Sequence, residues 1–491
     1  MPERTKVVMI GIDAGDVGWI ESSLGSLPRL RQLFEDCPPV RLRSSADTLT
    51  SSVWPTFATG SLPGEHGAYY PMQWDPASMT LRRVTDQWLY YEPFWYDLAR
   101  RGRRVTVLDA PFCHPSRLPS GVEVLNWGSQ ECLGPFHANR PELAREIQRR
   151  FGRHPMGAEI PVEQTAGKLE QIRGSLVRGA EKKAQLARYL MESTEWDLFL
   201  TVFSECHRGG HIFWPPPAGS RSKVPPGALE EVYQAVDRAI DHLLKRVDFE
   251  TTTVIVFSVH GMRANYTQEQ FLLELMGRVN ATYRGERFSK QEEAAPKRQS
   301  GLMRGLREAL PPQLQYHVAR MLPAGVRDWV VRRAFLGPLD WKQTLGFGLL
   351  GSGESYLRYN LAGRELEGVE EQDSEAFRTY ERHLTQCLEG LTNSSTGEPV
   401  VKELVKTGER YPGPRSKYLP DLTILWEDQL PVPEIESEVL GRLHGQLGTG
   451  RTGDHQETGF YVVAGNRNGL EDVLPLEHIV DFAGFVKRLL A

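Results

Sequence analysis

Acidic and imidazole side chains gather in one short stretch of this chain. Residues 204–214, SECHRGGHIFW, place Glu205, His207 and His211 within seven residues of one another. Two histidines four residues apart share one face of a helix, a common way to present two nitrogens to one metal ion. The two glycines between them disfavour a helix, so a surface turn with two solvated histidines is the alternative.

Further residues of this kind are scattered along the chain, namely Asp13, Thr50, His260 and His455. Imidazole and carboxylate ligands together suit Zn²⁺ and related divalent ions, and a hydroxyl among them is a candidate metal-activated nucleophile. Pro55 is tolerated only in the first turn of a helix, which places Thr50 near a helix amino terminus, where free amides favour anions. A phosphate group could dock there.

Short apolar runs typical of buried strands lie just before several of these residues. The runs cover residues 7–12, 104–109, 198–203 and 254–257. Helical patterns separate them, and this alternation predicts an α/β fold with a mostly parallel central sheet and helices on both faces. Because ligands bind at the carboxyl ends of such strands, we expect the candidate residues to converge at one edge of the sheet.

From about Arg278 to Pro338 the pattern changes to basic sequence interrupted by prolines. We interpret this as a helical insertion over or beside the sheet and as a candidate lid. Two later apolar runs, at 422–426 and 459–464, return to strand character. The sequence therefore predicts a catalytic core made of residues 1–277 and 441–491, with the insertion at 278–440 between its two parts.

The composition is that of an ordinary globular protein, with 491 residues of which 40% are hydrophobic and 25% charged. The net charge of -5 argues against binding a nucleic acid polymer, which normally needs a basic excess. The five cysteines form no paired framework, which favours a reducing compartment. No apolar run is long enough for a membrane helix and no secretory signal is evident, so we predict a cytoplasmic protein without membrane contact.

The motifs, in their order and placement, resemble those of the alkaline phosphatase superfamily, and within it the type I phosphodiesterase/nucleotide pyrophosphatase branch. The matching pieces are GIDAGD near the start, T-x-x-x-W-x-x-F-x-T-G-x-x-P-x-x-H-G at 50–67, FSExHxxxH, FSxHGM and the late GDHxxxG. The resemblance covers nearly the whole chain. It implies an alkaline phosphatase-like fold and a metal-dependent phosphodiesterase or phosphohydrolase acting on a small phosphorylated substrate, such as a nucleotide.

The resemblance also implies roles for individual residues. Thr50 is the implied nucleophile, which forms a covalent phospho-enzyme intermediate. The implied metal ligands are Asp13, Thr50 and His260 for one ion, and His207, His211 and His455 for another. Zinc is the expected ion, with Mn²⁺ or another divalent ion as the alternative.

Two departures from the family pattern change the charge of this site. His207 stands where the family usually has Asp, and Val259 also replaces an Asp, so two carboxylates are missing. Glu205 and Asp454 are candidates to restore a negative charge. The sequence leaves open whether one or two ions bind.

Three other interpretations follow from the same residues. The altered ligand set is compatible with transfer to an acceptor other than water, or with a catalytically silent binding protein that keeps the fold. The stretch CHPSR at 113–117 fits the sulfatase pattern C-x-P-x-R, but sulfatases carry that cysteine where this chain has Thr50, which favours a structural Cys113. His66 and His154 are expected to be loop histidines rather than ligands.

Overall fold

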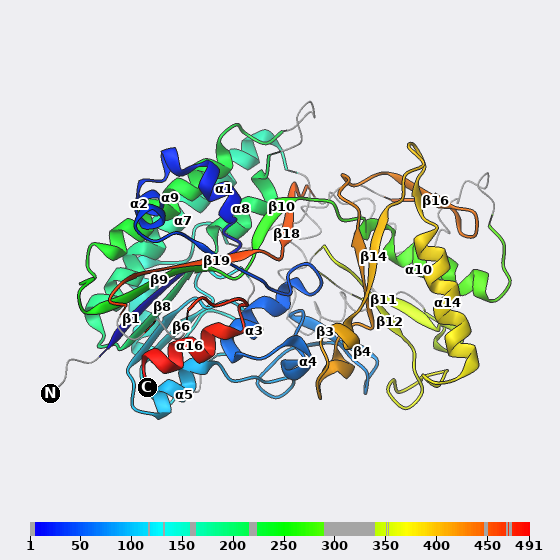
Figure 1. Cartoon of the computed structure of the whole chain (residues 1–491), viewed down its shortest axis with the longest axis horizontal. Helices are drawn as coiled ribbons and strands as arrows, with labels where there is room; N and C mark the ends of the chain where they lie inside the picture. Colours follow the sequence, from blue (N-terminus) through cyan, green and yellow to red (C-terminus); the bar gives the residue numbers. More distant parts are fainter. Residues whose placement is uncertain are drawn as a thin grey trace.

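The architecture was derived from a computed structural model that describes residues 5–115, 118–130, 133–157, 164–215, 223–288, 339–349, 351, 353–445, 450–467, 470 and 474–491. At its centre lies an eight-stranded sheet (Figure 1). In spatial order its strands are β2 (Val40–Leu42), β19 (Gly459–Gly465), β9 (Thr252–Ser258), β1 (Lys6–Ile12), β8 (Leu198–Phe203), β5 (Val105–Leu108), β6 (Val122–Leu125) and β7 (His137–Ala138). Strands β9, β1, β8, β5 and β6 run parallel, whereas β2, β19 and β7 pair antiparallel at the two sides. The predicted mostly parallel sheet is confirmed.

Side chains of the central strands alternate between two hydrophobic cores, one on each face of the sheet. In β1, Val8 and Ile10 face the first core, whereas Val7 and Met9 face the second. The first core is covered by α1 (Val17–Ser22), α2 (Pro28–Asp36), α6 (Pro141–Phe151), α7 (Ala166–Ser193), α8 (Glu205–Phe213) and α9 (Ala228–Leu244). The second is covered by α3 (Val53–Thr59), α5 (Phe94–Arg100) and α16 (Asp481–Leu489). Helices therefore cover both faces, as predicted.

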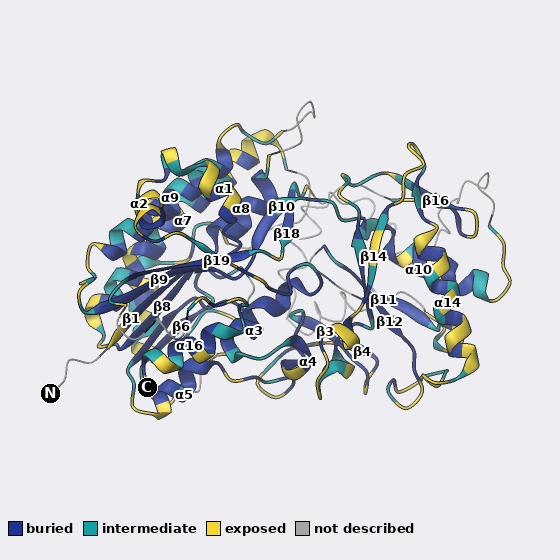
Figure 2. Ribbon diagram, viewed as in Figure 1, coloured by how far each residue is buried: buried dark blue, intermediate teal, exposed yellow. Residues whose placement is uncertain are grey.

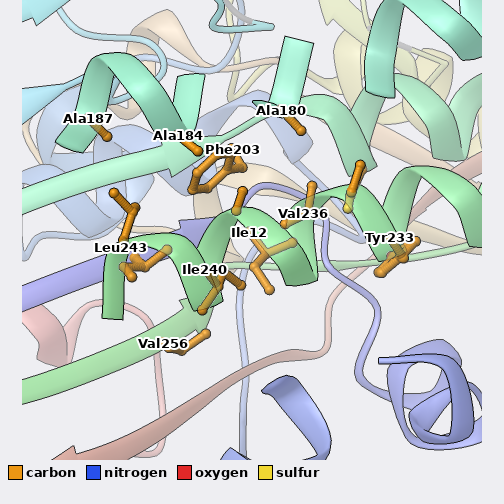
Figure 3. Close-up of a cluster of buried hydrophobic side chains, with 14 of the residues drawn as sticks. Ile12, Ala180, Ala184, Ala187, Phe203, Tyr233, Val236, Ile240, Leu243 and Val256 are labelled. Atoms are coloured by element: carbon orange, nitrogen blue, oxygen red, sulfur yellow. The ribbon is translucent and has the colours of Figure 1, made fainter. Parts of the chain in front are cut away.

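The first core shows why helices α7 and α9 lie on this face of the sheet. Small residues of α7, among them Ala180 and Ala184, let it approach Phe203, while Val236 and Ile240 of α9 pack nearby (Figure 3). All of these side chains are at most 3% exposed. Coloured by burial, the sheet is dark and the exposed residues lie on the outer sides of the helices (Figure 2).

A second group of elements lies at the other end of the long axis of the molecule (Figure 1). Its four-stranded antiparallel sheet has the order β11 (Gly346–Leu349), β12 (Ser355–Tyr359), β15 (Leu422–Trp426) and β14 (Val401–Lys406). Helices α10 (Leu272–Tyr283) and α14 (Glu375–Glu389) share a hydrophobic core with this sheet. A three-stranded sheet follows, made of β13 (Thr392–Asn393), β16 (Glu434–Ser437) and β17 (Gly441–His444).

The described residues 339–349, 351 and 353–440 of this group form strands together with α14, and the strand predicted at 422–426 is present as β15. The proline-rich pattern that suggested helices belongs to a stretch of which residues 289–338 lie outside the described residues. Both faces of β12 and β15 are covered, since all five residues of β12 and four of the five residues of β15 are buried. The domain boundaries at 277 and 440, and the function of a lid, stay predictions.

Short elements connect the two groups and complete the fold. They are β3 (Met72–Asp75) paired with β4 (Thr80–Arg83), β10 (Gly261–Ala264) paired with β18 (Gly453–Gln456), and the small helices α4 (Pro63–His66) and α15 (Thr407–Arg410). Within the described residues, no helix combines the length and the apolar character that crossing a membrane requires. The cytoplasmic location stays a prediction.

Candidate metal and phosphoester site

Three neighbouring strands of the central sheet deliver candidate residues to the same edge. Asp13 directly follows β1, and His207 lies in the first turn of α8, which follows β8. His260 follows β9, and both β8 and β9 pair with β1. The convergence predicted from the strand ends is therefore present in the structure.

Asp13 is placed by a tight turn at the end of β1. The backbone of Ala14 has φ 51°, a left-handed conformation that is uncommon for a residue other than glycine. The amide of Gly15 donates to Ser258 Oγ at 3.0 Å, which ties the turn to the end of β9. The turn directs the Asp13 carboxylate toward α8 and α3.

The two histidines of α8 lie on one face of a buried helix, and the alternative of a solvated surface turn is not what the structure shows. Of the two glycines between them, Gly210 is in close packing. A Cβ on Gly210 would lie 2.7 Å from Met262 Cε, and a Cβ on Gly453 would lie 2.2 Å from the Gly210 carbonyl oxygen. Strand β18 can therefore approach α8 closely enough to bring His455 to the two histidines.

The side chains of His207, His211 and His455 meet at their Nε2 atoms. His207 Nε2 lies 3.0 Å from His211 Nε2 and 3.0 Å from His455 Nε2. All three side chains are buried. In a tetrahedral zinc site with Zn–N bonds of about 2.0–2.1 Å, ligand nitrogens lie roughly 3.3 Å apart. The three histidines thus fit a single divalent ion.

The opposite ring nitrogen of each histidine faces an oxygen. His207 Nδ1 lies 2.9 Å from Asp13 Oδ2, and His211 Nδ1 lies 3.0 Å from the carbonyl oxygen of Gly453. His455 Nδ1 lies 3.4 Å from Asp454 Oδ1, but neither atom has a hydrogen-bond partner among the described residues. The acceptors beside His207 and His211 orient these two rings, and the Nε2 atoms of His211 and His455 both lie beside that of His207.

The protonation of the site suits metal binding. Burial lowers the pKa of His211 and of His455 well below the ordinary value, with repulsion from Arg451 and from neighbouring rings adding to the effect. Burial pushes the pKa of Asp13 upward, but the attraction of His207 and its hydrogen bond outweigh this, so the pKa is lowered. Neutral imidazoles beside an ionised carboxylate are the forms that ligate or support a cation.

His260 forms a second group of possible ligands together with Asp13 and His207. Both of its ring nitrogens are buried and have no hydrogen-bond partner within the described part of the chain. Burial lowers the pKa of His260 well below the ordinary value. The ring centroid lies 5.6 Å from that of His207 and 5.1 Å from that of His455.

Thr50 opens the 3-10 helix η2 (Thr50–Ser52), which continues directly into α3. Pro55 is the third residue of α3, so the predicted position of Thr50 at a helix amino terminus is confirmed. Thr50 is 2% exposed, and its hydroxyl donates to the carbonyl oxygen of Ala46 at 2.7 Å. Near the same place, Trp54 Nε1 donates to Asp13 Oδ1 at 2.8 Å.

Thr50 and His455 line one small cavity of about 30 Å³. Asp454 and Arg263 line it from the β10–β18 pair, and Thr423 to Trp426 of β15 line it from the second sheet. The second group of elements therefore borders the site. The wall of the cavity thus carries both acidic and basic side chains, among them Asp454 and Arg263.

The two additional carboxylates predicted from the sequence have different surroundings. Asp454 lies at the cavity, and burial raises its pKa. Glu205 is fully buried and its Oε1 lies 2.9 Å from His154 Nε2, away from the groups that could hold a metal ion. Burial pushes the pKa of Glu205 upward, but the charge of Lys183 and the hydrogen bond of His154 outweigh it, so the pKa is lowered. Glu205 thus belongs to a buried ion network.

Arg451 is a residue of this site that the sequence did not single out. Its Nη2 donates to His211 Nε2 at 2.9 Å. The only signal in the sequence is a basic residue four positions before His455. Arg451 brings a fixed positive charge to the nitrogen that would also bind a cation.

The histidines and the cysteine assigned to structural roles are packed away from this cluster. His66 Nε2 lies 3.1 Å from Thr56 Oγ1, and His154 contacts Glu205. Cys113 is buried in the second core, and burial raises its pKa well above the ordinary value. This is the opposite of what a reactive thiolate needs.

Three comparisons relate the chain to known proteins. Solved structures similar to it include phosphonoacetate hydrolase from Sinorhizobium meliloti 1021 in complex with phosphonoformate (12% identity, TM-score 0.49, covering 100% of this chain and 96% of that one). Murine ectonucleotide pyrophosphatase/phosphodiesterase 5, an inactive variant with AMP, is 11% identical with a TM-score of 0.44, covering 99% and 95%. The human protein of that name is 12% identical with a TM-score of 0.46, covering 99% and 94%.

No sequence among the curated proteins matches the chain. The family profile described as type I phosphodiesterase / nucleotide pyrophosphatase matches residues 7–298, which include Asp13, Thr50, His207, His211 and His260. The match extends over more than half of the chain and confirms the resemblance drawn from the motifs. The chain belongs to the type I phosphodiesterase / nucleotide pyrophosphatase family.

Proposed function

We propose that this protein is a metal-dependent phosphoester hydrolase in which Thr50 is the nucleophile. The observation that carries the proposal is that Thr50 and His455 line the same cavity, while His455 also belongs to the three-histidine group. Family membership supports a reaction of the phosphodiesterase or pyrophosphatase type. The proposed substrate is a small phosphodiester or pyrophosphate, such as a nucleotide.

His207, His211 and His455 would hold a divalent ion, which we propose to be zinc, with Mn²⁺ as the alternative. Three nitrogen donors favour zinc over the hard ions that prefer oxygen. When bound, such an ion supplies positive charge that polarises a phosphoryl oxygen and lowers the pKa of a hydroxyl or water. The family pattern also predicts a second ion, bound by Asp13, Thr50 and His260.

Thr50 would attack phosphorus through Oγ1, forming the Oγ1–P bond while the bond from phosphorus to the leaving oxygen breaks. The Ala46 carbonyl, which accepts the Thr50 hydroxyl at 2.7 Å, holds the side chain in one rotamer. The hydroxyl proton is released to solvent. A water molecule then hydrolyses the phospho-threonine and returns the hydroxyl, with phosphate or a phosphomonoester as the product.

The test is a pair of substitutions assayed with p-nitrophenyl phosphodiesters. We expect Thr50→Ala to lower kcat by on the order of 10³ or more while zinc content is retained, because the loss falls on the transition state. Thr50→Ser should keep part of the rate, and the neighbouring Ser51→Ala serves as the control. In a quenched reaction with labelled substrate, the label should lie on Thr50. Normal hydrolysis by Thr50→Ala would contradict the threonine nucleophile.

The same assay separates the two alternatives. Transfer to an acceptor other than water would release the leaving group without an equivalent amount of hydrolysis product when alcohols are supplied. A zinc-loaded protein that turns over neither phosphomonoesters nor phosphodiesters would favour a silent binding protein.

A further inference from the structure

His207 stands where the family usually has a carboxylate, and this changes the role of the neighbouring Asp13 at the metal site. We propose that the site holds one metal ion, bound by His207, His211 and His455, and that Asp13 orients His207 instead of binding an ion. The proposal rests on the metal site of the proposed function. It departs from the arrangement in which Asp13 ligates a second ion.

The first step of the argument concerns the single lone pair of a neutral imidazole. His207 is a member of both possible ligand groups, one with Asp13 and His260 and one with His211 and His455. Its Nδ1 lies 2.9 Å from Asp13 Oδ2, and an ionised carboxylate only accepts hydrogen bonds, so the proton of the neutral ring is on Nδ1. The remaining lone pair is then on Nε2, which points to His211 and His455.

The second step concerns the other two rings. The carbonyl oxygen of Gly453, 3.0 Å from His211 Nδ1, can only accept, so the His211 proton is on Nδ1 as well. His211 Nε2 accepts from Arg451 Nη2 at 2.9 Å and lies 3.0 Å from His207 Nε2. The lone pairs of His207 and His211 thus face one place, and a metal ion bound there would take the position of the guanidinium as the partner of His211 Nε2.

The third step concerns the two oxygens of Asp13. Oδ2 accepts from His207, and Oδ1 accepts from Trp54 Nε1 at 2.8 Å. Both oxygens already have a donor, and Asp13 is fully buried. A carboxylate that accepts from a metal-binding histidine fixes its tautomer and makes the ring a stronger ligand. Asp13 has the contacts of such a carboxylate.

The fourth step concerns charge. With histidine at position 207 and valine at 259, Asp13 is the carboxylate that is hydrogen-bonded to the three-histidine group, while Arg451 adds a positive charge 2.9 Å from His211 Nε2. A second dication in this buried place would be repelled by the first and by the guanidinium. These charges therefore favour the binding of one metal ion over the binding of two.

The experiment measures zinc without any substrate, so a failure of the threonine mechanism does not affect it. Full-length protein is stripped with a chelator and reloaded with zinc, and bound zinc is determined by elemental analysis and by competition titration. We expect one zinc per chain in the wild type. Zinc K-edge absorption should show three imidazole nitrogens in its coordination.

The variant Asp13→Asn decides between the two roles of Asp13. We expect it to bind one zinc at saturation with an affinity reduced by about 10–100-fold, the effect of losing a group that orients a ligand. His207→Ala should lose zinc under the same conditions, and the exposed Asp36→Asn is the matched control with wild-type affinity. Two zinc ions or none in the wild type, or an Asp13→Asn protein that is folded but lacks one ion, would overturn the proposal. If Asp13→Asn fails to fold, the wild-type stoichiometry and absorption spectrum decide alone.

Discussion

The guanidinium of Arg451 donates to His211 Nε2 at 2.9 Å, which is the nitrogen that His211 turns toward His207. A neutral imidazole nitrogen has one lone pair, so it can accept from Arg451 or bind a metal ion, but not both. Metal binding at the three histidines therefore requires Arg451 to move away. A guanidinium released from His211 is well suited to bind the oxygens of a phosphoryl group.

Arg451→Met is expected to strengthen zinc binding, because it removes both a competing donor and a positive charge near the ion. The dissociation constant of zinc, measured by competition with a chromophoric chelator, should fall by about tenfold or more. The same variant should bind inorganic phosphate more weakly in the zinc-loaded state. Arg442→Met, at a partly exposed arginine of β17, is the control. Weaker zinc binding by Arg451→Met would show that the arginine supports the site instead of competing for it.

His211→Ala and His455→Ala are each expected to remove zinc to a similar extent, since either change leaves two of three protein ligands. Elemental analysis of the purified variants should show a large and comparable loss of zinc. His444→Ala, which replaces an exposed histidine paired with Glu434, should keep the wild-type zinc content. Full retention of zinc by His455→Ala would remove β18 from the site.

Lys183→Met is expected to destabilise the protein by about 3 kcal/mol. Lys183 Nζ lies 3.0 Å from Asp109 Oδ2, and both side chains are fully buried. Without the ammonium group, Asp109 and the nearby Glu205 lose the cation that compensates them inside the core. Urea unfolding of the variant, compared with that of Lys168→Met at an exposed position of the same helix, measures the difference. The control should change the free energy of unfolding by less than about 0.5 kcal/mol.

His66 is expected to make the fold sensitive to acid. Burial and the nearby charge of Arg415 lower its pKa from 6.5 to about 3. The geometry agrees, because Nδ1 accepts from the Ala68 amide at 3.1 Å and cannot also carry a proton. Between pH 6.5 and 3 the unfolded chain binds a proton that the folded chain does not, so stability falls as pH decreases through this window.

The contribution of His66 should amount to about 2–3 kcal/mol between pH 6.5 and 4.5. Denaturant unfolding as a function of pH measures it. His66→Asn, whose side-chain oxygen can still accept from the Ala68 amide, should show a smaller loss of stability over this range. An identical pH dependence in the variant and the wild type would mean that His66 is protonated in the folded state.

The sequence alone determined the central fold and most members of the site. Apolar runs of strand length ended at Asp13 and before Glu205 and His260, and parallel strands place such ends along one edge. Pro55 placed Thr50 at the beginning of a helix for a purely local steric reason. These properties depend on neighbours in the chain, which is why they could be predicted from it.

Other properties depended on contacts between distant segments. Gly209 and Gly210 suggested a turn from their propensities, yet both lie in α8, where Gly210 packs against Met262 and against Gly453 of β18. The partner of Glu205 is His154, and the partner of Asp13 is His207, 194 residues away. The sequence supplied the donor and acceptor types, but only the packing of α8 between β18 and the end of β1 decided which oxygen each ring nitrogen faces. That choice sets the tautomers of the histidines, and through them where a metal ion can bind.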